Sequence, residues 1–132
     1  MFLKQTLNST VFLIDDNEID NFIHHRVLKN FSDSLEVLIF SSGSDALEQL
    51  RKNRILPQFI FLNLHLPQNS GLKFLDAFEK MDIEKKQTSI YILSTMLFPC
   101  DMENLKNNTN YSGYIQKPLT AEKLISALDK NG

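Results

Sequence analysis

Cysteine is almost absent from this sequence, since the 132 residues contain only Cys100. A single cysteine excludes an internal disulfide and suits a reducing cytosol. The N-terminus lacks an apolar stretch long enough for a signal peptide or a membrane span. We therefore expect a cytoplasmic protein that does not interact with a membrane.

The sequence also lacks an excess of charge of either sign. Its 14 Lys and Arg residues nearly balance its 16 Asp and Glu residues, and the net charge of −2 gives no reason to expect nucleic-acid binding. Internal repeats, low-complexity tracts and linkers are missing as well. A chain of this length fits one domain, residues 1–132, with a real core. Because the chain stops right after the last predicted helix, we expect no output domain.

Five short apolar runs are present, and their β-branched content predicts strands that are buried on both faces. These are residues 10–14, 35–40, 59–62, 89–93 and 113–116. Helical patterns lie between and after them, at residues 18–31, after a cap at Ser42, after Gly71, more weakly at about 101–107, and after a cap at Thr120. This alternation predicts an α/β fold, with a parallel sheet covered by helices on both faces.

Polar side chains occur at the ends of four of these strands. Asp15 and Asp16 follow the first strand, Asn63 ends the third, Ser94 follows the fourth and Lys117 follows the fifth. Each residue alone has an ordinary explanation as a turn former. Ligands of open α/β sheets, however, bind outside the carboxyl ends of the strands. Four polar strand ends at that one edge therefore indicate a binding site.

This pattern resembles the receiver domain of two-component response regulators over nearly the whole chain. The resemblance implies a flavodoxin-like (βα)5 three-layer sandwich with strand order 2-1-3-4-5, two helices on one face and three on the other. It also implies a magnesium site formed by Asp15, Asp16, Asn63 and the backbone carbonyl of His65. Carboxylates and other oxygens are the ligands that magnesium prefers.

Further positions match motifs of the same family. Pro67 and Gly71 match its loop after the third strand, and Lys117 matches its lysine before a proline. The resemblance gives Ser94 and Lys117 the role of contacting phosphate. It also makes Ser94 and Tyr114, three residues before the lysine, the expected switch residues.

Residue 63 departs from the family pattern. The family's aspartate at this position accepts phosphate from a histidine kinase, whereas an asparagine amide is not a useful nucleophile. We therefore expect a regulatory domain with no catalytic residue, and phosphate acceptance only if Asn63 is restored to Asp. The site also has one negative charge fewer, so magnesium binding should be weak.

Three functions remain open. The first is a pseudo-receiver that acts by protein–protein interaction, which Gln58 and the unusual His65 favour. The second is an ordinary phosphate-accepting receiver with an Asp-to-Asn change at residue 63, which the other retained site residues favour. The third and most distant is an enzyme or cofactor binder on the same fold, although the sequence lacks a Gly-rich phosphate loop after the first strand.

The resemblance also implies the partners and the surface that binds them. These are signalling proteins, either a histidine kinase or a downstream effector. They would bind the face formed by the fourth helix, fifth strand and fifth helix, which includes Tyr114. The binding partner would be a separate protein or, in a dimer, a second copy of the chain.

Overall fold

The structure is a computed structural model that describes residues 10–52, 56–108 and 110–131. Residues 1–9, whose sequence predicts no signal peptide, lie outside the described residues. The strands are β1 (Thr10–Ile14), β2 (Glu36–Phe40), β3 (Phe59–Leu62), β4 (Ser89–Ser94) and β5 (Tyr111–Gln116). The helices are α1 (Glu18–Phe31), α2 (Gly43–Lys52), α3 (Ser70–Lys80), α4 (Pro99–Leu105) and α5 (Ala121–Asn131), with short 3-10 turns at Pro67–Asn69 and Lys85–Gln87.

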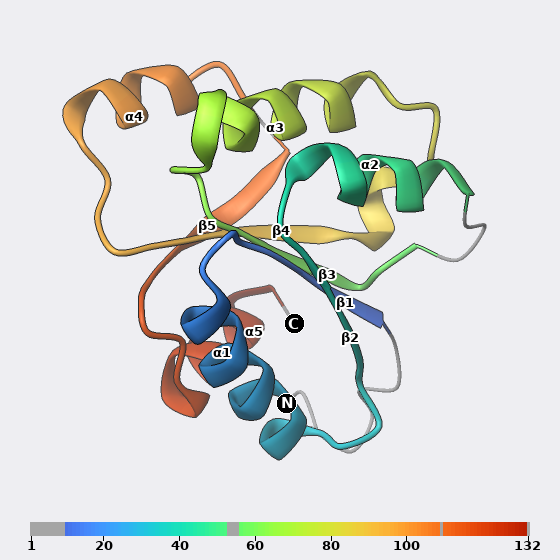
Figure 1. Ribbon diagram of the computed structural model, residues 1–132, viewed down its shortest axis with the longest axis vertical. Helices are drawn as coiled ribbons and strands as arrows, with labels where there is room; N and C mark the ends of the chain where they lie inside the picture. Colours follow the sequence, from blue (N-terminus) through green and yellow to red (C-terminus); the bar gives the residue numbers. More distant parts are fainter. Residues whose placement is uncertain (1–9, 53–55, 109, 132) are drawn as a thin grey trace.

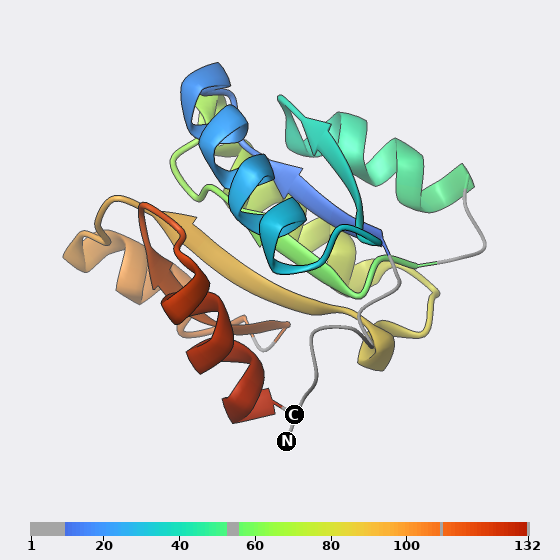
Figure 2. The ribbon, with the colours of Figure 1, turned by 90° about the horizontal axis from the view of Figure 1, so that it is seen from below.

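All strand pairs are parallel, and the sheet order is β2-β1-β3-β4-β5. The predicted order is therefore confirmed. Helices α1 and α5 cover one face of the sheet, and α2, α3 and α4 cover the other, as Figure 1 shows. The view from below in Figure 2 shows α1 and α5 side by side in front of the sheet. The predicted three-layer arrangement, with two helices on one face and three on the other, is also confirmed.

The sheet separates two hydrophobic clusters, one under each helical layer. Alternate residues of β1 divide between them, because successive side chains of a strand point to opposite faces. Val11 and Leu13 join the cluster under α1 and α5, whereas Phe12 and Ile14 join the other. All four are 0–1% exposed, so β1 is the doubly buried strand that its apolar run predicts.

Side-chain caps begin several of the helices. Ser42 Oγ accepts from Asp45 N (3.2 Å) at the start of α2, and Thr120 Oγ1 accepts from Lys123 N (3.2 Å) at the start of α5. Both caps were expected from the sequence. Helix α1 is capped by Asn17, whose Oδ1 accepts from Asp20 N (2.9 Å).

Some element boundaries differ from the predicted ones. Helix α4 begins at Pro99, two residues earlier than expected, because the Asp101 carboxylate accepts from Phe98 N (2.7 Å) and closes the first turn. Strand β5 begins at Tyr111, two residues early, since its pairing with β4 continues across an irregularity at Ile90 and Tyr91. No helix among the described residues is long and apolar enough to cross a membrane.

Gly71 lies in the first turn of α3, where the helix presses against the loop that follows β3. A Cβ atom at this position would be 2.4 Å from the carbonyl oxygen of Leu64 and 2.9 Å from that of Asn63. Since real Cβ contacts are never this short, only glycine lets α3 approach the backbone of residue 63 so closely.

Candidate functional site

Four polar side chains from four strand ends meet at the carboxyl edge of the sheet. We call this group, Asp15, Asn63, Ser94 and Lys117, the polar cluster. Backbone hydrogen bonds between neighbouring strand ends fix its frame: Asn63 N donates to Ile14 O (2.9 Å), and Lys117 N donates to Ser94 O (2.9 Å). The structure thus brings together the residues that the sequence predicts at this edge.

The side chain of Asn63 is buried and is hydrogen-bonded through both its oxygen and its nitrogen. Its Oδ1 accepts from Ser94 Oγ (3.1 Å) and from His65 N (3.2 Å), while its Nδ2 donates to Asp15 Oδ1 (3.2 Å). Ser94 Oγ also accepts from Leu64 N (3.1 Å). These contacts fix the direction of the amide, because only its nitrogen can donate to a carboxylate.

Lys117 is bound by two carboxylates. Its Nζ lies 2.6 Å from Asp15 Oδ2 and 2.7 Å from Asp20 Oδ2. Burial lowers the pKa of the Lys117 ammonium, but the hydrogen bonds and charges of Asp15 and Asp20 outweigh burial and leave the pKa above its ordinary value. Lys117 is therefore a cation inside the cluster, and its described ion pairs are with Asp15 and Asp20.

Some of the oxygen atoms that the resemblance implies as magnesium ligands already have other partners in this arrangement. Asp15 Oδ1 accepts from Asn17 N (3.0 Å) and Asn63 Nδ2, whereas the buried Oδ2 lies 2.6 Å from Lys117 Nζ as an ion pair and has no hydrogen-bond partner of good geometry among the described residues. Asn63 Oδ1 already accepts two hydrogen bonds, and Asp16 is exposed. No group of three or more His, Cys, Asp or Glu among the described residues is placed to hold a metal ion. Magnesium needs only one or two protein carboxylates beside its waters, but an ion bound to Asp15 in this arrangement would have to displace Lys117.

The predicted switch residues, Ser94 and Tyr114, are directly connected. The Tyr114 hydroxyl donates to Ser94 O (3.0 Å), and the Ser94 side chain is bound to Asn63. Burial raises the pKa of the Tyr114 hydroxyl, which keeps the hydroxyl a donor at neutral pH. Tyr114 is thus linked to residue 63 through one intervening residue.

A second polar contact joins the loop after β3 to the start of α4. His65 Nε2 and Asp101 Oδ2 are 2.7 Å apart, and the His65 ring lies 5.5 Å from the Phe98 ring. Burial raises the pKa of Asp101, but hydrogen bonds from Phe98 N and His65 outweigh it and leave the pKa below its ordinary value. Asp101 is therefore ionised at neutral pH, and the histidine nitrogen is the donor.

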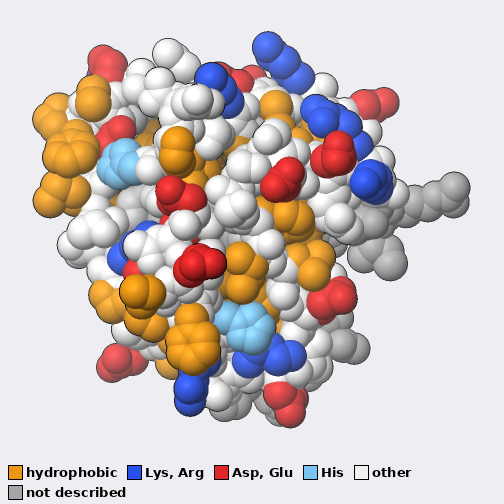
Figure 3. Space-filling view, in the orientation of Figure 1, with side chains coloured by type: hydrophobic (Ala, Val, Ile, Leu, Met, Phe, Trp, Pro, Cys, Tyr) orange, Lys and Arg blue, Asp and Glu red, His pale blue; other side chains and the backbone are white. Residues whose placement is uncertain are grey.

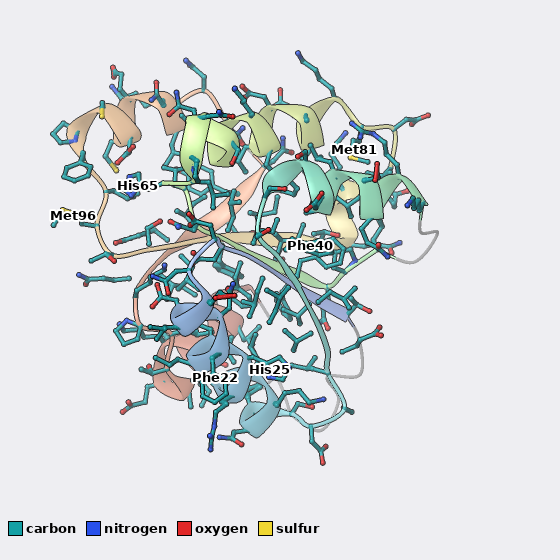
Figure 4. All side chains as sticks on the ribbon, in the orientation of Figure 1. Phe22, His25, Phe40, His65, Met81 and Met96 are labelled. Carbon is teal, nitrogen blue, oxygen red and sulfur yellow. The ribbon has the colours of Figure 1, made fainter. Side chains whose placement is uncertain are left out.

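We call His65, Phe98 and Asp101 the α4 corner. Figure 4 shows His65 on the loop below α4, with Met96 farther out on the segment that leads to this helix. Met96, Phe98 and Met102 are 50%, 49% and 53% exposed. In Figure 3, hydrophobic side chains gather beside a histidine over this end of the molecule. The α4 corner thus combines a partly buried ionic contact with an exposed apolar surface.

Sequence reasoning did not find Asn17, Asp20 or Asp101. Asn17 and Asp101 carry a recognisable signal, since one is an asparagine just before a helical pattern and the other is an acid in a helical first turn. Asp20 has no such signal. Its partner Lys117 is 97 residues away in the sequence, so only the folded chain brings them together.

Comparisons with known proteins agree with this architecture. Residues 11–129 match the family model of the response regulator receiver domain. A two-component response regulator structure from Legionella pneumophila is 23% identical, with a TM-score of 0.77 over 92% of this chain and 95% of that one. Another from Cytophaga hutchinsonii is 26% identical, with a TM-score of 0.78 over 92% and 94%.

A curated relative is an uncharacterized response regulatory protein of Vibrio cholerae. It is 23% identical over 122 residues, which are 92% of this chain and 47% of the relative. The chain therefore spans about half the length of the relative that it matches.

Proposed function

This chain belongs to the response regulator receiver family, and on that premise we propose that it is a pseudo-receiver, which takes no phosphate at residue 63. Receiver domains are regulatory domains that interact with histidine kinases and effector domains. The observation that carries the proposal is the hydrogen bond from Asn63 Nδ2 to Asp15 Oδ1 (3.2 Å). A carboxylate at residue 63 would have no proton to donate there at neutral pH.

The chemistry of residue 63 supports the same conclusion. The lone pair of an amide nitrogen is delocalised and its oxygen is neutral, so attack on phosphorus is far slower than from a carboxylate. The neighbours Leu62 and Leu64 carry no hydroxyl that could replace it. Ser94 has a hydroxyl, but it donates to Asn63 Oδ1 and accepts from Leu64 N.

Magnesium binding is weak in this proposal, and no chemical step depends on it. Receiver domains in general bind magnesium at their acidic pocket. Here Asp15, Asp16, Asn63 and the carbonyl of His65 are the proposed ligands, but Asp15 is already paired with Lys117. A cytoplasmic location is part of the same proposal and rests on the family and on the single cysteine.

The proposed partner surface is the face formed by α4, β5 and α5. Each of these elements exposes a large apolar side chain: Met102 is 53% exposed, Tyr114 38% and Ile125 47%. Exposed apolar groups of this kind mark protein interaction sites when they lie together. A separate signalling protein or a second copy of the chain would bind there, with Ser94 and Tyr114 as the switch pair.

Phosphorylation by a small donor tests the proposal. Wild type and Asn63→Asp would be incubated with acetyl phosphate and magnesium, and their intact masses measured. We expect no adduct on wild type and one phosphate on Asn63→Asp, because Asp15, Ser94 and Lys117 remain in place. Asn108→Asp is the matched control, since Asn108 is also a buried asparagine. A phosphate on wild type that maps to residue 63 would overturn the proposal.

The phosphorylation of Asn63→Asp also bears on the alternative of an ordinary receiver with a changed residue 63. That alternative requires the remainder of the site to be competent, so Asn63→Asp must be labelled. If it is not labelled, the site has lost more than one carboxylate, and the alternative fails while the pseudo-receiver proposal stands.

A further inference from the structure

Lys117 joins two carboxylates, one from the polar cluster and one from the start of α1. Its Nζ contacts Asp15 at the end of β1 and Asp20 in the first turn of α1, at 2.6 and 2.7 Å. We infer that Lys117 supplies from within the protein the positive charge that a divalent cation would otherwise supply at this edge, and that Asp20 is the positioning residue that holds it there.

The three side chains are placed firmly enough for this role. The side chains of Lys117, Asp15 and Asp20 are 11%, 5% and 30% exposed. Asn17 links the two acids, because its N–H donates to Asp15 Oδ1 (3.0 Å) and its Oδ1 accepts from Asp20 N (2.9 Å). A lysine is a flexible point charge, so two fixed carboxylates define its position where one alone would not.

The ammonium group blocks the usual access of a metal to the acids. It takes Asp15 Oδ2, while Asn63 Nδ2 and Asn17 N take Asp15 Oδ1. A metal ion bound to Asp15 would have to displace Lys117 and would meet its positive charge at short range. The melting temperature of the wild-type protein should therefore not depend on magnesium.

This inference goes beyond the proposed function, because the charge balance of the cluster does not depend on whether residue 63 can take phosphate. The tests measure only metal binding and thermal stability. If these tests contradict the inference, the pseudo-receiver proposal still stands. The result of the phosphorylation experiment, in turn, does not decide this inference.

The first test compares thermal melts in magnesium and in chelator. Wild type should melt at the same temperature in both. Lys117→Met should melt lower than wild type in chelator and should gain about 5 °C in about 10 mM magnesium, the shift expected for a site of about millimolar affinity. Lys123→Met is the matched control, because among the described residues Lys123 Nζ bonds to two backbone carbonyls, Gln116 O and Pro118 O, near the same strand end. It should show no magnesium-dependent shift.

The second test isolates Asp20. Asp20→Asn alone leaves Lys117 with Asp15 as its one remaining ion-pair partner among the described residues, so magnesium should compete for Asp15 and a magnesium-dependent shift that wild type lacks should appear. A merely structural role of Asp20 would lower both melts equally and produce no shift. The absence of a shift would therefore overturn the role of Asp20.

Wild type itself supplies the remaining outcomes. Calorimetric titration of wild type should detect no magnesium binding up to about 10 mM, and binding detected within that range would overturn the inference. If Lys117→Met folds only when magnesium is present, magnesium replaces the charge of Lys117, and the inference is supported more strongly than by a shift in melting temperature. If Lys117→Met does not fold even with magnesium, the same melts in magnesium and in chelator are measured for Lys117→Gln, whose amide can still donate to Asp15. If Lys117→Gln also shows no magnesium-dependent shift, the inference is overturned.

Discussion

The polar cluster and the α4 corner are adjacent at the carboxyl edge of the sheet, yet they are stabilised by different means. In the polar cluster, Asn63 bonds to Asp15, Ser94 and His65, and Lys117 pairs with the buried carboxylate of Asp15. In the α4 corner, one ionic contact, His65 to Asp101, lies beneath exposed apolar groups. The first region has little contact with solvent, whereas the second offers a surface to a partner.

This difference separates two properties that a receiver normally combines. The polar cluster is the place where chemistry would occur, and its members bond to one another through Asn63, Ser94 and Asp15. The α4 corner is connected to it through His65, whose N–H donates to Asn63 Oδ1 (3.2 Å) while its ring binds Asp101. A change at residue 63 would therefore reach α4 through one residue.

The largest effect is expected from Asn63→Asp in the absence of metal. The substitution removes the donor to Asp15 Oδ1 and places a second carboxylate next to the first, so we expect the free energy of unfolding to fall by about 2 kcal/mol. Denaturant melts in chelator measure this. Asn108→Asp is the control, since Asn108 Oδ1 accepts from Asn110 N (2.9 Å) and a carboxylate can do the same. An Asn63→Asp protein as stable as wild type would refute the electrostatic argument.

The next effect concerns magnesium affinity. Restoring the carboxylate adds a negative charge and an oxygen ligand, so Asn63→Asp should bind magnesium with about millimolar affinity, at least about tenfold more tightly than wild type, which should show no binding up to about 10 mM. Calorimetric titration of both proteins measures the difference. Equal affinities would show that Lys117, rather than the amide of residue 63, alone limits the metal.

A smaller effect is expected from breaking the α4 corner. Asp101→Ala loses the acceptor for Phe98 N and for His65, both at 2.7 Å, and should lower the free energy of unfolding by about 1 to 2 kcal/mol. Glu103→Ala on the same helix is the control, because Glu103 is exposed and forms only a surface ion pair with Lys106. Hydrogen exchange of α4 amides should rise in Asp101→Ala alone. Equal exchange in both variants would contradict the importance of this contact.

The smallest effect on stability is expected at Tyr114. Tyr114→Phe removes only the hydrogen bond to Ser94 O (3.0 Å) and should cost about 1 kcal/mol or less. Measuring how much binding partner the protein captures tests the role of Tyr114 more directly than stability does. Tyr114→Ala should weaken capture through the α4, β5 and α5 face, whereas Ile39→Ala, at an exposed apolar residue on the far edge strand β2, should not. If Tyr114→Ala captures as much partner as wild type, the α4, β5 and α5 face is not the binding surface.

Local patterns predicted the elements well where the residues themselves decide the structure. The bounds of β1, α1 and β3 match the predicted ranges, since apolar runs and a regular helical stripe end abruptly at polar residues. The start of α4 was less predictable, because it depends on the Asp101 side chain returning to Phe98 N. The order of the strands came from the family resemblance, since alternation alone predicts a parallel sheet but no order.

The polar residues of the site were predictable because they end the strands, whereas their pairing was not. The sequence places Lys117 and Asn63 at the same edge, but the described ion pairs of Lys117 are with Asp15 and Asp20. Asp20 lies inside a helix in which an acid in the first turn has an ordinary explanation, favourable interaction with the helix dipole. Its role depends on the three-dimensional position of α1 over the end of β1, which no local pattern encodes.

Gly71 gives the site a mechanical property. Where α3 meets the loop after β3, backbone contacts backbone, and no side chain lies between them that could change rotamer and absorb a displacement. A push on the first turn of α3 is therefore transmitted directly to the carbonyl groups of Asn63 and Leu64. We therefore expect the first turn of α3 and the loop after β3 to move together, because the two backbones are in direct contact at Gly71.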